Sequence, residues 1–265
     1  RAWGAWLNAV QLDEAKAISR QCQSSGIPVV FLKGTQLLTE VYKRTTDRSM
    51  NDIDILITEK DKAKLHQLLV ERGYREDAVL RWSASAHKAD YFKKNNEGIT
   101  LHVDIHTQLL FEQESIGVRT RWSDDGEFCF LDHDDQLFHF VVHIGYQHVF
   151  DHYKNLRDIF MYLKTYPQLN GERFWQLAKK NGVTHLCWAT LHIVEREFGV
   201  MLPLKNRQPP TLKSRLLAAL ITPQFLQQPK MSVRYLLIKH LSKKSLWQSL
   251  RYDILWVIAK IRGAR

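Results

Sequence analysis

The stretch that decides the fold is Asp52-Ile53-Asp54-Ile55-Leu56-Ile57, in which acidic and apolar residues alternate. On a strand, side chains two residues apart point to the same face, so the three isoleucines are expected to pack into a core. Asp52 and Asp54 then project together from the opposite face, ~7 Å apart. Two bare like charges on one face are costly unless water or a cation compensates them. The stretch therefore predicts a buried strand that presents acids to a divalent metal.

A second stretch, Thr100–His106, has the same alternation, with His102, Asp104 and His106 on the face opposite its apolar residues. If this strand neighbours the first, Asp104 lies beside the acid pair. Three carboxylates can bridge two divalent ions about 4 Å apart, the spacing of two-metal phosphoryl or nucleotidyl transfer. Oxygen ligands favour Mg²⁺ or Mn²⁺ over zinc. The alternative for a lone Asp-x-Asp is a solvated strand face, and the two histidines either contact substrate or fill the rim of the sheet.

A tight turn precedes the acid strand in the sequence. The apolar run from residue 29 to 32 is typical of a buried strand, and helical spacing of apolar residues begins at Leu37. Lys33-Gly34-Thr35 lies between them. Free backbone N–H groups at a helix start bind anions, glycine permits close approach, and Lys33 adds a positive charge. Taken alone, the turn is a weak signal and is more typical of a plain strand-to-helix connection than of a phosphate site.

The rest of the chain indicates an α+β fold. Helical patterns cover the first ~25 residues and residues 60–72, and further strands are expected around residues 79–92 and 128–131. From residue 132 onward the apolar spacing is helical. We therefore expect residues 1–131 to form a small mixed-sheet core with flanking helices, and residues 132–265 to form an all-helical domain with a basic amphipathic tail.

Composition excludes several classes of protein. The chain has 265 residues, of which 45% are hydrophobic and 25% charged, so global disorder is not expected. Cys22, Cys129 and Cys187 are widely separated, which argues against a disulfide framework or a cysteine zinc site and favours the reducing cytoplasm. No stretch reaches the ~20 uninterrupted apolar residues of a membrane-spanning helix.

Positive charge is concentrated in the tail. Residues 230–265 contain nine Lys or Arg and one acid, Asp253, which gives +8 of the whole chain's +10. An apolar stripe at helical spacing runs through the same segment from Leu246 to Ile261. The tail is interpreted either as a helix packed on the helical domain, or as a peripheral contact with an anionic membrane surface or RNA.

Several of these motifs together resemble a known family. Leu32-Lys33-Gly34, Tyr42, Arg48, the strand 52–57 and Val103-Asp104-Ile105-His106 are similar to the uncharacterised nucleotidyltransferase family of the DNA polymerase β-type superfamily. A weaker similarity extends to Leu156-Arg157-Asp158-Ile159. The resemblance implies a nucleotidyltransferase core in which Asp52 and Asp54 hold two Mg²⁺ or Mn²⁺ ions. It also implies that Asp104 binds the catalytic ion, and that Gly34 and Thr35 contact the nucleotide phosphates.

The implied activity is transfer of a nucleoside monophosphate from an NTP, with ATP favoured, by in-line attack of an acceptor on the α-phosphate. Lys33 and Arg48 would offset the charge of the β- and γ-phosphates, and Ser49 would also touch phosphate. The acceptor is a small molecule, a protein or an RNA. The alternative is a degenerate nucleotidyltransferase fold that acts as a nucleic-acid or membrane-surface binding module through its tail.

Two histidine pairs at helical spacing are a separate candidate site. His139 and His143 are four residues apart, as are His148 and His152, a spacing that can place two imidazoles on one metal. Neither pair has the glutamate of a His-Glu-x-x-His motif. Structural or site-lining roles are therefore favoured over metal binding.

Overall fold

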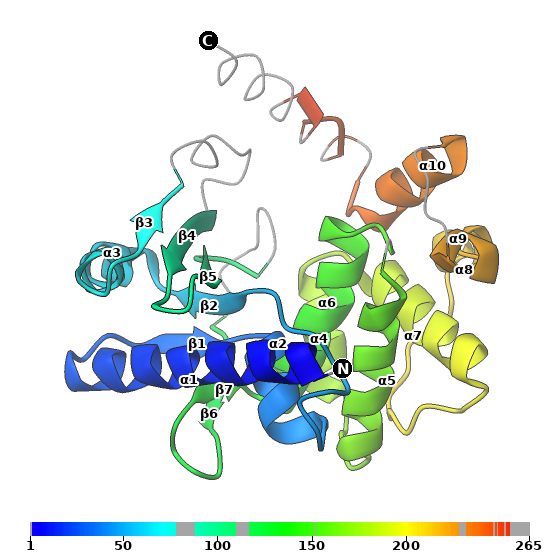
Figure 1. Ribbon diagram of the computed structural model, residues 1–265. Coiled ribbons are helices and arrows are strands. Elements are labelled where there is room, and N and C mark those ends of the chain that lie inside the picture. The colour runs from blue at the N-terminus through cyan, green and yellow to red at the C-terminus, as the bar shows by residue number, and fades with distance from the viewer. Residues whose placement is uncertain are drawn as a thin grey trace. The chain divides into compact units, whose positions relative to one another are not determined.

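The computed structural model describes residues 2–77, 88–109, 117–150, 152–227, 232–245, 247, 249–251, 253 and 254 (Figure 1). These residues form two compact units. The first contains the described residues up to 109 together with residues 119–132, and the second contains residues 117 and 118 and the described residues from 133 onward. Each unit buries its own apolar core.

The first unit is built on a mixed sheet of seven strands in the order β3-β4-β5-β2-β1-β7-β6. In the centre of this sheet, β2 pairs antiparallel with β1 and parallel with β5. On one side of this centre, β3 pairs with β4 and β4 pairs with β5, both antiparallel. On the other side, β1 pairs parallel with β7, and β7 pairs antiparallel with β6. The strands are β1 Val29–Phe31, β2 Ile53–Ile57, β3 Arg75–Glu76, β4 Lys88–Lys94, β5 Thr100–His106, β6 Thr120–Trp122 and β7 Cys129–Leu131.

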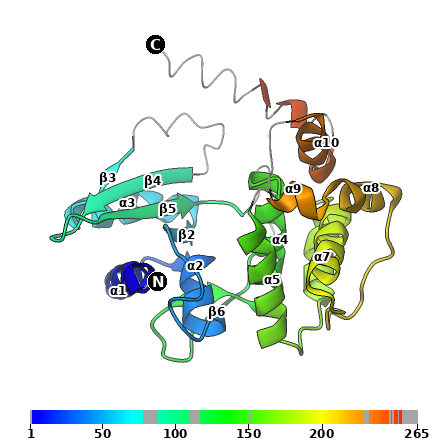
Figure 2. The ribbon, with the colours of Figure 1, turned by 45° about the vertical axis from the view of Figure 1, so that its right-hand side comes forward.

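Helices flank this sheet. The long helix α1 (Ala2–Ser24) lies along one side of it and is seen nearly end-on in Figure 2. The turn after β1 leads into α2 (Gly34–Gln36), which continues as the π-helix η1 (Leu37–Val41). A 3-10 turn, η2 (Glu59–Asp61), leads into α3 (Lys62–Glu71). The apolar residues of β2 are buried, as the alternation in its sequence predicts.

The second unit contains helices and no strand among its described residues. Helices α4, α5 and α7 pack against one another and run side by side in Figures 1 and 2. No helix in the described part of the chain is long and apolar enough to cross a membrane. The helices are α4 His133–Val142, the π-helix η4 His143–Gln147, α5 Tyr153–Thr165, α6 Glu172–Lys180, α7 Thr184–Phe198, α8 Leu212–Leu220, α9 Pro223–Gln227 and α10 Val233–Ser242.

The predicted fold class is confirmed: a mixed sheet with flanking helices precedes a run of helices. The short strands β3 and β6 were not predicted. Of the strand expected around residues 79–92, the part from 79 to 87 lies outside the described residues, and the remainder is in β4.

Candidate active site

Three aspartates lie in one row across three neighbouring strands. Asp54 of β2 is in register with Asp104 of β5, and Asp104 is in register with Asp90 of β4. Neighbouring strands are ~4.8 Å apart, so the row gathers three carboxyl groups on one part of the sheet. All three residues are buried. The structure therefore brings Asp54 and Asp104 together, and it adds Asp90, which the sequence reasoning missed.

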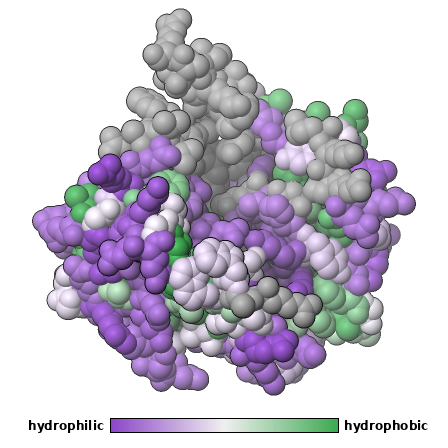
Figure 3. All heavy atoms as spheres, in the orientation of Figure 1, coloured by the Kyte–Doolittle hydropathy of each residue, from purple (hydrophilic) through white to green (hydrophobic). Residues whose placement is uncertain are grey.

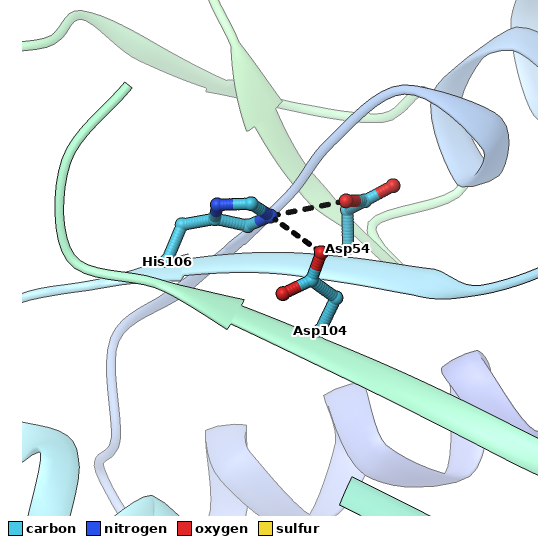
Figure 4. Close-up of side chains that lie close together, drawn as sticks. All are labelled: Asp54, Asp104 and His106. Carbon is cyan, nitrogen blue, oxygen red and sulfur yellow. Dashed lines mark hydrogen bonds and ion pairs between the residues drawn. The ribbon is translucent and has the colours of Figure 1, made fainter. Parts of the chain in front are cut away.

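The imidazole of His106 lies between two of these aspartates (Figure 4). Its Nε2 atom is 3.1 Å from Asp54 Oδ1 and 3.2 Å from Asp104 Oδ2. One ligand atom from each residue lies within 4.8 Å of the others, and no other group of three or more His, Cys, Asp or Glu in the described part of the chain meets this condition. Asp104 Oδ1 is buried and accepts no hydrogen bond from any described residue. The carboxylate oxygens and the imidazole nitrogen of this group are suitable ligands for a divalent cation.

Two lysines pair with the same row of acids. Lys33 Nζ lies 2.5 Å from Asp54 Oδ1, and both side chains are largely buried. Lys88 Nζ lies 2.7 Å from Asp104 Oδ2 and 3.6 Å from Asp90 Oδ1. The cluster thus contains its own positive charges, which compensate the carboxylates where no metal is bound.

Acidic and basic groups alternate along the whole cluster, which we call the charge row. From Lys33 it passes through Asp54, His106, Asp104, Lys88 and Asp90, and it ends at His102, whose Nε2 lies 2.7 Å from Asp90 Oδ1. Every consecutive pair lies within 4.0 Å. A cation that binds these acids must therefore compete with a nitrogen group at each of them.

The charge row shifts the pKa values of its members. Burial alone would raise the pKa of Asp54, but the charge of Lys33 and the hydrogen bond from His106 outweigh burial, so the pKa lies well below its ordinary value. Burial of Asp104 is likewise outweighed by the charge and hydrogen bond of His106, and its pKa is lowered. Burial would lower the pKa of His106, whereas Asp104 and Asp54 raise it. These directions favour ionised carboxylates and a protonated imidazole.

Asp52 lies immediately before β2 and is half-buried. It does not belong to the compact group formed by Asp54, Asp104 and His106. Burial, followed by the charge of Asp54, raises the pKa of Asp52, while Lys33 opposes this change. Asp52 therefore lies within electrostatic reach of the charge row, and a bound cation would relieve its repulsion from Asp54.

The turn that contains Lys33 has an unusual backbone. Lys33 has φ 43° and ψ −106°, a conformation that non-glycine residues rarely adopt. At Gly34, an added Cβ would lie 2.9 Å from Met50 Cγ and 3.1 Å from Arg48 Nη1. A side chain at this position would force Met50 and Arg48 to shift, so the glycine lets the loop of residues 44–50 approach the turn closely. Thr35 is fully buried, and its Oγ1 has no partner among the described residues.

One side chain of α1 holds that loop. Asn8 Nδ2 donates to the carbonyl oxygens of Thr45, at 2.5 Å, and Arg48, at 2.6 Å. Asn8 Oδ1 accepts from the backbone N–H of Met50 at 2.9 Å. The Arg48 side chain itself donates to the carbonyl of Ser49 at 3.1 Å. Arg48 and Ser49 are therefore placed beside the Lys33 turn by a helix that the sequence reasoning did not connect with the site.

Lys88 and Asp90 could have been found from the same period-two pattern that identified Asp104. In β4, Ala89 and Tyr91 are buried apolar residues, so Lys88 and Asp90 alternate with them as Asp104 alternates with its apolar neighbours. The pairing of β4 with β5 turns that alternation into a shared face.

The histidine pairs of the second unit do not form a comparable group. The ring centres of His139 and His143 are 5.7 Å apart, and those of His148 and His152 are 5.5 Å apart. Within the described residues, neither pair belongs to a group of three or more ligands that could hold a metal. That these histidines have structural or site-lining roles stays a prediction.

Comparison with protein families identifies a relationship for most of the chain. The model of a family described as uncharacterised nucleotidyltransferases matches residues 5–199 of the chain, a range that includes every member of the charge row. No curated protein and no solved structure matches the chain significantly.

Proposed function

Because the chain belongs to the uncharacterised nucleotidyltransferase family, we propose that it transfers a nucleoside monophosphate from an NTP to an acceptor. The observation that supports this most strongly is the register of β2 and β5, which sets two buried carboxylates side by side. Burying like charges together is costly, and such clusters are typical of sites that bind cations or catalyse reactions.

We propose Mg²⁺ or Mn²⁺ as the cofactor, with two ions held by Asp52, Asp54 and Asp104. Asp104 Oδ1, which has no partner in the described part of the chain, and the closeness of Asp54 support this assignment. His106 is a further candidate ligand, because its Nε2 already contacts both aspartates. When bound, such ions supply charge stabilisation at the transferring phosphoryl group and lower the pKa of the attacking hydroxyl.

The residues around the Lys33 turn would bind the triphosphate. The backbone N–H groups of Gly34 and Thr35 are the candidate phosphate ligands of this turn, and the buried Thr35 hydroxyl has no partner among the described residues. Arg48 and Ser49 lie beside the turn and would contact the β- and γ-phosphates. Lys33 would exchange its contact with Asp54 for a phosphate oxygen once cations neutralise the acids.

The acceptor hydroxyl would attack the α-phosphate as the P–O bond to pyrophosphate breaks, and Asp104 would receive the hydroxyl proton. ATP is the favoured NTP, and the acceptor is a small molecule, a protein or an RNA. The three cysteines are free thiols, which is consistent with our placing the reaction in the reducing cytoplasm.

Pyrophosphate release tests this function. The full chain would be incubated with each of the four NTPs and Mg²⁺ or Mn²⁺ in a lysate fraction, with α-³²P label to reveal the modified acceptor. We expect release and labelling with the wild type, loss of both by at least a hundredfold in Asp54→Asn, and no loss in Asp124→Asn, an exposed aspartate of the same unit. Wild-type protein that neither binds nor turns over any NTP would exclude the proposed reaction.

A further inference from the structure

Two segments near the end of the second unit expose large apolar side chains. Val233, Leu236 and Leu237 of α10 are 76, 42 and 47% exposed. Trp247, Leu250 and Ile254, in the segment that follows, are 73, 50 and 55% exposed. We call these six residues the apolar face. Figure 3 shows hydrophobic colour at the upper right, where Figure 1 places α10.

Each half of the apolar face lies on one side of a helix. Positions 233, 236 and 237 have the i, i+3, i+4 spacing, and positions 247, 250 and 254 have the i, i+3, i+7 spacing. The opposite sides are packed already, because Ile238 and Ser249 are fully buried. The apolar face is therefore what remains exposed after these segments have packed against the unit.

Two contacts join the segments. His240 Nδ1 lies 2.7 Å from Ser249 Oγ, and Lys239 Nζ lies 2.5 Å from Asp253 Oδ1. Since both contacts link α10 to the segment 247–254, the two halves of the apolar face belong to one neighbouring pair of elements. Exposed apolar groups gathered in this way are typical of an interaction surface.

The positive charge beside the apolar face favours an anionic partner. Arg234, Lys244 and Arg251 are exposed beside the apolar face, and residues 230–265 as a whole carry +8. A second copy of this chain would bring the same positive charge to the contact, which opposes self-association. RNA binding without base-specific contacts uses several aromatic platforms, and Trp247 is the one aromatic member of the apolar face. Exposed Leu, Val, Ile and Trp flanked by Lys and Arg suit the interface of an anionic bilayer.

We propose that the apolar face and its flanking arginines and lysine bind peripherally to an anionic membrane surface. Binding would insert the six apolar side chains at the depth of the lipid headgroups and leave the basic residues in contact with lipid phosphates. Each Lys or Arg near such a surface increases partitioning about fivefold.

Vesicle sedimentation of the full chain tests the proposal. Phosphatidylcholine vesicles and vesicles with one quarter phosphatidylglycerol would be compared at 0.1 and 0.5 M NaCl. We expect binding to the anionic vesicles alone, weakened at the higher salt, where screening is stronger. Arg234→Gln with Arg251→Gln should reduce the binding about 25-fold. Leu236→Ser with Leu237→Ser should reduce it at least tenfold.

The matched control is Lys179→Gln with Lys180→Gln, which removes the same charge from exposed positions of α6. It should bind within twofold of the wild type, and all variants should keep the wild-type melting temperature. No binding to anionic vesicles, equal binding to neutral vesicles, an equal loss in the control, or retention by single-stranded RNA in place of vesicles would each overturn the proposal. Asp54→Asn should bind vesicles normally, which separates this outcome from that of the transferase assay.

Discussion

Replacing Lys33 by Met removes the positive charge nearest to Asp54 while keeping an unbranched side chain that is one atom shorter. The ammonium lies 2.5 Å from a carboxylate whose side chain is 2% exposed. Breaking a buried pair by removing one partner costs about 3–5 kcal/mol of unfolding free energy. Asp54 retains His106 as a second partner, so we expect the lower end, about 3 kcal/mol, without metal. For a chain of this size, that corresponds to a fall in melting temperature of about 6–12 °C.

Divalent cations should reverse much of this loss. With Lys33 absent, a cation no longer competes with the ammonium for Asp54, so the variant should bind Mn²⁺ more tightly than the wild type does. A cation at a hundred times its dissociation constant stabilises a folded protein by about 2.7 kcal/mol. The wild type gains stability from Mn²⁺ as well, so the gap narrows by the ratio of the two dissociation constants; we expect a ratio of about thirtyfold, which narrows the gap by about 2 kcal/mol when saturating Mn²⁺ replaces EDTA in urea unfolding.

Lys88→Met is the matched control. It removes the same charge from the same charge row, but the Lys88 side chain is 37% exposed, so we expect a loss of about 1 kcal/mol or less. The reasoning is refuted if Lys33→Met is no less stable than Lys88→Met in EDTA, or if Mn²⁺ leaves the gap between Lys33→Met and the wild type unchanged.

Four further predictions concern the same site. His106→Ala should weaken Mn²⁺ binding at least tenfold in titration calorimetry, and wild-type affinity should rise with pH, because a protonated imidazole must lose its proton to bind metal; equal affinities would remove His106 from the ligand set. In EDTA, the Asp54 carboxylate should make its whole contribution to the unfolding free energy above its ordinary pKa of 3.8. This contribution should be lost as pH falls through the lowered pKa that Asp54 has in the folded protein. The protonated His106 imidazole, whose pKa is raised, should make its whole contribution to the unfolding free energy below pH 6.5, and this contribution should be lost as pH rises through the folded-state pKa. If the difference in unfolding free energy between the wild type and His106→Gln does not change with pH from 4 to 9 in urea unfolding, this prediction is wrong. Gly34→Ala should cost about 1 kcal/mol and raise the KM for NTP, because its Cβ would push Met50 and Arg48 away, and an unchanged KM would argue against phosphate binding at this turn.

The period-two alternation of two stretches was enough to predict β2 and β5 and to place Asp54 and Asp104 on comparable faces. Alternation specifies which residues share a face, but not which strands become neighbours or in what register they pair. The contact of His106 with both aspartates depends on that register, and so does the row that adds Asp90. These contacts could be stated only once the pairing was known.

Short elements were harder to predict for a different reason. β6 has three residues and none of them is buried, so its sequence lacks the apolar alternation on which prediction relies. The π-helical continuation from Leu37 to Val41 keeps a helical pattern of apolar residues and cannot be told from an α-helix by spacing alone. The role of Asn8 rests on hydrogen bonds to a loop some forty residues away, which local sequence does not reveal.

Through the side-chain amide of Asn8, α1 holds the loop of residues 44–50 in addition to packing against the core. The main-chain groups of residues 45, 48 and 50 all hydrogen-bond to this one side chain, which ties α1 to the loop that bears Arg48. A shortened protein that begins after α1 would retain every acid of the charge row yet lose the anchor of its arginine. Any shortened chain that is meant to keep Arg48 in place must therefore start upstream of Asn8.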